Sequence, residues 1–112
     1  MNDLIKKLVE AYGPSGFEDQ MRELIRPEIE KFADENSVDA MGNLIARKKG
    51  GPKGRGKNGL KVMIAAHMDE IGLMISHITE DGFCRFTNIG GIYPHTLLGS
   101  RVQFADGRIG II

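Results

Sequence analysis

An apolar run that ends in a histidine constrains the fold of this chain more than any other feature. Residues 62–66 are apolar and uncharged, and His67 and Asp69 follow almost at once. An uninterrupted apolar run of this length is typical of a strand that is covered on both faces. We therefore expect a buried strand over residues 60–66 that ends at the histidine. Side chains two residues apart on a strand point to the same side, which would place His67 and Asp69 over one space.

A histidine and a carboxylate at this spacing fit a metal site. Neutral imidazole binds divalent metal ions well, and a neighbouring carboxylate can fix its tautomer and raise its basicity. His67 is therefore the candidate metal ligand, and Asp69 is the candidate residue that supports it. Taken alone, the pair also matches an ordinary strand end, where a histidine meets solvent beside a turn acid.

Composition and charge exclude several classes of protein. The 112 residues fit one small globular domain, and no apolar stretch has the length of a membrane span. Cys84 is the only cysteine, so an internal disulfide is excluded; we expect a cytoplasmic protein in which Cys84 is a small buried hydrophobe. Seven bases lie among glycines in residues 47–61, with no interleaved aromatic residues for stacking on nucleic acid. We interpret this segment as a solvated hairpin loop and expect no nucleic-acid partner.

Local signals predict two helices followed by strands. Apolar residues recur at helical spacing over residues 4–12, and Gly13 stands where a C-terminal cap belongs. Ser15 and Glu18 have the spacing of a capping box, which predicts the start of a second helix. Three hairpins are then expected from strand patterns around turn residues, at 37–40 and 43–48, at 71–79 and 83–87, and at 101–105 and 108–112. The last strand ends the sequence without a cap, so we expect a chain cut short or one whose partner strands lie in another polypeptide.

Five segments in order resemble the tetrahedral and glutamyl aminopeptidases, whose relatives include deblocking aminopeptidases and proteins labelled endoglucanases. The resemblance covers nearly the whole chain. It lies in residues 13–18 (Gly-Pro-Ser-Gly-Phe-Glu), 39–46 (Asp-Ala-Met-Gly-Asn-Leu-Ile-Ala), 65–74 (Ala-Ala-His-Met-Asp-Glu-Ile-Gly-Leu-Met), 90–91 (Gly-Gly) and 97–102 (Leu-Leu-Gly-Ser-Arg-Val).

The resemblance implies a fold, a reaction and an assembly. The fold class would be α/β, with residues 1–69 as the N-terminal part of a zinc-exopeptidase-like α/β domain. Residues 70–112 would be the first strands of an inserted β-rich dimerisation domain. Members of the family remove N-terminal residues from short peptides with two divalent metal ions, zinc or cobalt, and form homo-oligomers built on dimers, up to dodecamers. Mapped by motif, His67 matches the metal-ligand histidine and Asp69 the adjacent catalytic aspartate.

The family pattern also extends well beyond residue 112, where it places the remaining ligands and the general base. One histidine and one supporting aspartate do not make a two-metal site. We therefore expect the N-terminal portion of a metallo-aminopeptidase, inactive and at most weakly metal-binding on its own. The alternative is a non-catalytic, β-rich oligomerisation or binding module. A glycosidase is less favoured, because Asp69 and Glu70 would point to opposite faces instead of flanking a sugar.

Overall fold

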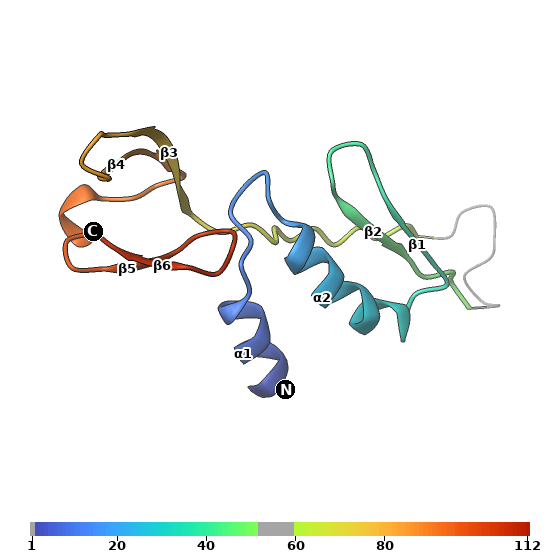
Figure 1. The fold of residues 1–112 in the computed structure, drawn as a ribbon. Helices are drawn as coiled ribbons and strands as arrows, with labels where there is room; N and C mark the ends of the chain where they lie inside the picture. Colours follow the sequence, from blue (N-terminus) through green and yellow to red (C-terminus); the bar gives the residue numbers. More distant parts are fainter. Residues whose placement is uncertain (1, 52–59) are drawn as a thin grey trace. The chain divides into compact units, whose positions relative to one another are not determined.

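The computed structural model describes residues 2–51 and 60–112, which form two compact units (Figure 1). One unit comprises the described residues up to Ala11 together with those from Glu18 to Met68, and the other comprises Tyr12–Phe17 and Asp69–Ile112. The elements of the first unit are α1 (Asn2–Glu10), α2 (Asp19–Glu30), β1 (Glu35–Val38) and β2 (Leu44–Arg47). Those of the second are β3 (Gly72–Ile78), β4 (Cys84–Ile89), the short 3-10 helix η2 (Pro94–Thr96), β5 (Arg101–Gln103) and β6 (Ile109–Ile111).

Both helices form where the apolar spacing predicts them, but the second has a different start from the expected one. The N-cap residue of α2 is Glu18, whose own side chain makes no capping hydrogen bond. The predicted capping box is wrong because α2 begins at Asp19 with Glu18 as its N-cap, which leaves Ser15 ahead of the cap position. The hydroxyl of Ser15 donates a hydrogen bond to Asp69. Within the described residues, neither helix has the length and apolar character needed to cross a membrane.

The hairpin of β1 and β2 confirms the turn predicted at residues 41–42. The strands are antiparallel, and Val38 faces Leu44 at the last pair before the turn. Gly42 has a φ of +85°, a left-handed conformation that favours glycine. The Asp39 carboxylate accepts hydrogen bonds from the backbone N–H groups of Met41 and Asn43, both at 2.9 Å. The turn is thus closed by its own side chain, as is common for aspartate at this position.

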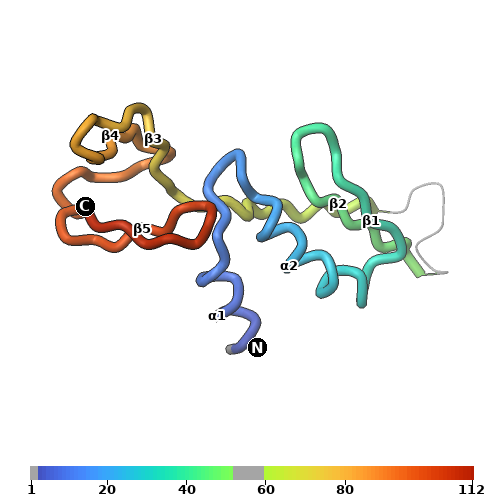
Figure 2. Tube along the Cα trace, viewed as in Figure 1, coloured from blue at the N-terminus to red at the C-terminus, as the bar shows by residue number. Residues whose placement is uncertain are grey.

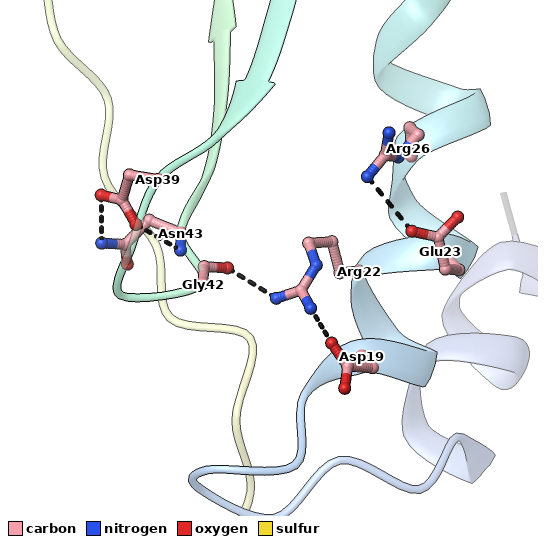
Figure 3. A network of polar contacts seen from close by, with 7 residues as sticks. All are labelled: Asp19, Arg22, Glu23, Arg26, Asp39, Gly42 and Asn43. Atoms are coloured by element: carbon pink, nitrogen blue, oxygen red, sulfur yellow. Dashed lines mark hydrogen bonds and ion pairs between the residues drawn. The ribbon is translucent and has the colours of Figure 1, made fainter.

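A polar network ties this hairpin to α2 (Figure 3). Nη1 of Arg22 donates to the carbonyl oxygen of Gly42 (2.7 Å), while Nη2 pairs with the carboxylate of Asp19. Arg22 is largely buried, with a side-chain exposure of 13%. The guanidinium therefore links one side of α2 to the tip of the hairpin, and a second pair, Arg26–Glu23 at 3.1 Å, lies further along the helix. Nothing in the sequence pattern singled out Arg22 for this role.

The second unit contains the other two predicted hairpins (Figure 2). Strands β3 and β4 are antiparallel, with a register shift between Ile75 and His77, and strands β5 and β6 are antiparallel without one. Gly82 and Gly107 in the two turns both have a φ of +85°. The local turn signals in the sequence therefore placed both hairpins correctly.

The strand expected over residues 60–66 is not formed. These residues belong to no helix or strand among the described residues, and Leu60 and Ile64 are each 91% exposed. An apolar run becomes a strand only when neighbouring strands satisfy its backbone N–H and C=O groups. The expectation of a buried Cys84 is also wrong, since the residue is exposed on β4. The solvated loop predicted at 47–61 lies mostly outside the described residues.

Little of the apolar surface is covered in either unit. Met21 on α2, at 7% exposure, is the one buried hydrophobic residue that the described part of the chain contains. Large apolar side chains are exposed on both units, among them Phe32 at 74% in the first and Leu98 at 79% in the second. Apolar surface of this extent is typical of faces that another polypeptide or domain covers.

Candidate functional site

The second unit holds its two sequence-distant segments together around Asp69. Pro14 and Glu70 form an isolated parallel β-bridge. The backbone N–H of Glu70 donates to the carbonyl oxygen of Gly13 (2.9 Å), and the N–H of Gly13 donates to Oε1 of Glu70 (3.1 Å). Gly13 and Pro14 are both buried. We call this arrangement of residues 13–15 against residues 69–72 the loop clamp.

Asp69 lies within the loop clamp and is half-buried. Its Oδ2 accepts a hydrogen bond from the hydroxyl of Ser15, which is also half-buried. A tight turn follows, in which the N–H of Phe17 donates to the carbonyl oxygen of Pro14 (2.8 Å). The candidate catalytic carboxylate is therefore held by a side chain that is 54 residues away in sequence.

Gly72 permits the close approach of the two segments. A Cβ atom at this position would lie 2.8 Å from the Cβ of Pro14, closer than carbon atoms in ordinary contact. Proline at position 14 has no freedom to swing its ring away, because the ring fixes φ. The loop clamp thus requires glycine at the start of β3.

His67, the candidate metal ligand, is exposed and follows the irregular segment 60–66. It belongs to the first unit, whereas Asp69 belongs to the second. The predicted contact between the imidazole and the Asp69 carboxylate therefore stays a prediction. His77 lies on β3 and His95 in η2, and both are exposed; the ring of His95 lies 5.9 Å from that of Tyr93, centroid to centroid.

The residues present fit one ligand position of a metal site, but not a complete site. Zinc in proteins normally has three or four protein ligands. Across residues 2–51 and 60–112, no group of three or more histidine, cysteine or acidic side chains is placed to hold a metal ion. His67 offers one donor of suitable chemistry, and Asp69 is a suitable support for it.

Sequence reasoning missed the role of Ser15 and the contact between Gly13 and Glu70. The sequence signal for the contact of Ser15 was a hydroxyl that directly follows a proline in a Gly-Pro-Ser-Gly turn. Ser15 also fits the pattern of a helix cap. A local sequence pattern does not show whether its hydroxyl contacts a nearby backbone amide or a carboxylate that is distant in sequence.

Comparisons with known proteins agree with the motifs. The sequence profile of the M42 glutamyl aminopeptidases matches residues 42–112. The lysyl aminopeptidase of Pyrococcus furiosus is 43% identical over 103 residues, which are 91% of this chain and 28% of that protein. Among solved structures, aminopeptidase APDkam598 from the archaeon Desulfurococcus kamchatkensis is 44% identical with a TM-score of 0.82, over 96% of this chain and 29% of that one. The TET1 peptidase of Pyrococcus horikoshii, which can assemble into a tetrahedron or a large octahedral shell, is 40% identical with a TM-score of 0.76, over 96% and 31%.

The chain spans less than a third of the length of these relatives. Its helices and small antiparallel sheets are consistent with the expected α/β class, and its neighbours in structure are the aminopeptidases that the motifs resemble. The family profile covers well over half of the chain and includes both His67 and Asp69. The chain therefore belongs to the M42 glutamyl aminopeptidase family.

Proposed function

We propose that the chain is the N-terminal portion of a metal-dependent aminopeptidase that removes N-terminal residues from short peptides. Family membership and the names of the relatives support the reaction class. The observation that carries the proposal for this chain is the hydrogen bond from Ser15 to Asp69. A carboxylate that is held by a specific donor and follows a histidine by two residues in sequence suits a supporting group for a metal ligand.

In this proposal His67 binds one of two divalent metal ions, zinc or cobalt, and Asp69 orients its imidazole. The metal pair would supply an activated water and polarise the scissile carbonyl group. The described residues provide one ligand and its support, so we place the remaining ligands and the general base in other parts of the complete protein. Residues 1–112 alone would then bind metal weakly and have no peptidase activity.

We further propose that residues 1–69 belong to the catalytic α/β domain and residues 70–112 to a β-rich domain used for dimerisation. Exposed apolar side chains on or beside the hairpins of the second unit support this, among them Phe83 at 73% and Ile111 at 78%. The same exposure favours the alternative function, a non-catalytic oligomerisation or binding module. Either protein would be a homo-oligomer. Its single cysteine is in keeping with a cytoplasmic location.

The first experiment is to purify the native polypeptide that carries this sequence, which we call the complete subunit. Its intact mass, its zinc and cobalt content and its hydrolysis of short peptides are then measured. About two metal ions per subunit with peptidase activity would support the enzyme. A subunit of only these 112 residues that assembles without metal or activity would favour the module.

His67→Ala in the complete subunit tests the site itself. We expect metal content and activity to fall together, because the variant removes a ligand. His77→Ala is the matched control: this exposed histidine lies on β3, outside the proposed site, and its loss should change neither quantity. Full metal content and full activity in the His67 variant would refute the assignment.

A further inference from the structure

We propose that Ser15 is a positioning residue, which holds the Asp69 carboxylate in the orientation that supports His67. This inference rests on the proposed function. Its structural basis is the hydrogen bond from the Ser15 hydroxyl to Oδ2 of Asp69. Ser15 would act on the metal ligand through Asp69 and would touch neither metal nor substrate.

A hydroxyl at this place restricts a side-chain torsion that is broadly distributed for aspartate in general. The last torsion of an aspartate side chain connects an sp³ carbon to a planar carboxylate, and its distribution is broad. A fixed donor on one carboxylate oxygen narrows that distribution and so determines where the second oxygen points. A defined orientation of the Asp69 carboxylate is what the proposed support of His67, two residues earlier in sequence, requires.

The loop clamp makes Ser15 a fixed donor. The N–H of Glu70 donates to the carbonyl oxygen of Gly13 (2.9 Å), which joins the backbone near Ser15 to the backbone beside Asp69, and the N–H of Gly13 donates to the side-chain Oε1 of Glu70 (3.1 Å). Donor and acceptor therefore sit on one framework, and their separation does not depend on a flexible loop. Support of this kind is what keeps a functional side chain within the narrow range of productive orientations.

The contacts of the loop clamp make it possible to distinguish a positioning role of Ser15 from a merely structural one. Neither hydrogen bond between Gly13 and Glu70 involves the Ser15 side chain, and neither does the turn bond from Phe17 to Pro14. Loss of the hydroxyl should therefore leave the loop clamp closed while it removes one hydrogen-bond donor from the Asp69 carboxylate. If the hydroxyl served only to fasten the loop, its loss would lower stability and leave metal affinity intact.

The test compares Ser15→Ala, Ser15→Thr and Ser100→Ala in the complete subunit. Ser100→Ala is the matched control, because the Ser100 hydroxyl also donates to a group in the second unit, the carbonyl oxygen of Thr96 (3.3 Å), away from Asp69. Zinc affinity is measured by competition with a chelator. The kcat and KM are measured on a chromogenic aminoacyl anilide, and stability is measured by the urea midpoint.

We expect Ser15→Ala to weaken zinc binding by about 10-fold, the lower end of the range for residues that support a metal ligand, because it acts through Asp69. The kcat should fall with it while KM and the urea midpoint stay close to those of the unmodified protein. Ser15→Thr, which keeps the hydroxyl, should restore both zinc affinity and kcat. Ser100→Ala should match the unmodified protein.

Three outcomes would overturn the assignment: unchanged zinc affinity and kcat in Ser15→Ala, a lower urea midpoint with unchanged zinc affinity, or an equal loss in Ser15→Thr. Should Ser15→Ala fail to fold, Ser15→Cys keeps the branching of the side chain with a slightly larger atom and a weaker donor, and should show the same loss. The His67→Ala variant distinguishes the two proposals. If it retains metal and activity, the proposed function fails; if it loses both while Ser15→Ala matches Ser100→Ala, only the role of Ser15 fails.

Discussion

Replacing Gly72 by alanine should open the loop clamp. The new Cβ would lie 2.8 Å from the Cβ of Pro14, 3.8 Å from its Cγ and 4.0 Å from Cδ1 of Ile89. Ordinary contact between carbon atoms begins near ~3.5 Å, so the two Cβ atoms would have to separate by about 0.7 Å. Gly72 is not among the glycines with positive φ, so the cost comes from this contact and not from the backbone conformation.

The expected net loss of stability follows from two opposing effects. Forcing an extra methyl group into an occupied space costs about 1–3 kcal/mol. Replacing glycine restricts the unfolded chain and returns about 0.4–1 kcal/mol. Gly72→Ala should therefore destabilise the fold by about 1–2 kcal/mol. The rigid ring of Pro14 makes the cost of overpacking larger than the gain from restricting the unfolded chain.

Urea denaturation followed by far-ultraviolet circular dichroism measures this loss in the complete subunit. Gly91→Ala is the matched control, since a Cβ there meets nothing within 4 Å and its φ is not positive. With a slope of about 2 kcal/mol per M, the midpoint of Gly72→Ala should fall by about 0.5–1 M. Gly91→Ala should be unchanged or slightly more stable. Equal midpoints for the two variants would show that Pro14 does not crowd Gly72, and would refute the reasoning.

Three further predictions concern residues outside the site. Met21→Ala should cost about 2 kcal/mol in urea denaturation, at the low end for a buried methionine because little other apolar surface of its unit is covered. Met41→Ala, at an 85% exposed position, should cost less than about 0.5 kcal/mol. Hydrogen bonds from the side chain and backbone of Asn43 hold the pKa of Asp39 below its ordinary value of 3.8. The ionised carboxylate therefore stabilises the hairpin fully at pH values above 3.8, and this stabilisation is lost as the pH falls through the lowered pKa. In thermal unfolding between about pH 2 and pH 6, the melting temperature of Asp39→Asn should fall less with acid than that of the unmodified protein. An identical dependence of melting temperature on pH in the two proteins would contradict this. The exposed thiol of Cys84 should react with a maleimide in the native 112-residue chain as fast as in urea, and strong native protection would show that the residue is covered.

The elements that the sequence predicted correctly are those whose signals are local. The turns at Gly82 and Gly107 are specified by residues within four positions of each other, and both hairpins formed as expected. The helical spacing before Gly13 likewise needs no distant partner. Local propensity and turn chemistry are sufficient in such segments.

The features that sequence reasoning missed depend on partners that are distant in sequence. Ser15 fits a capping box by spacing, but α2 begins only at Asp19, and the hydroxyl of Ser15 contacts a carboxylate that is 54 residues away in sequence. Arg22 reaches the carbonyl oxygen of Gly42 only because α2 and the β1–β2 hairpin lie together in the first unit (Figure 3). Pairings of this kind are decided by tertiary structure, which one sequence does not display.

The two residues of the proposed site are therefore held by different means. Asp69 is oriented by contacts within its own unit, since Ser15 and the loop clamp supply the donor and the framework. His67 follows a segment that forms no strand with any other described residue, although its apolar run is typical of a strand covered on both faces. Strand partners for residues 60–66 would fix the backbone that ends at His67, whereas Asp69 needs no such help. In the proposed enzyme Asp69 is thus held by its own unit, whereas the backbone at His67 depends on strand partners for residues 60–66. This is a second physical reason, besides the lack of a complete ligand group among the described residues, to expect weak metal binding from residues 1–112 alone.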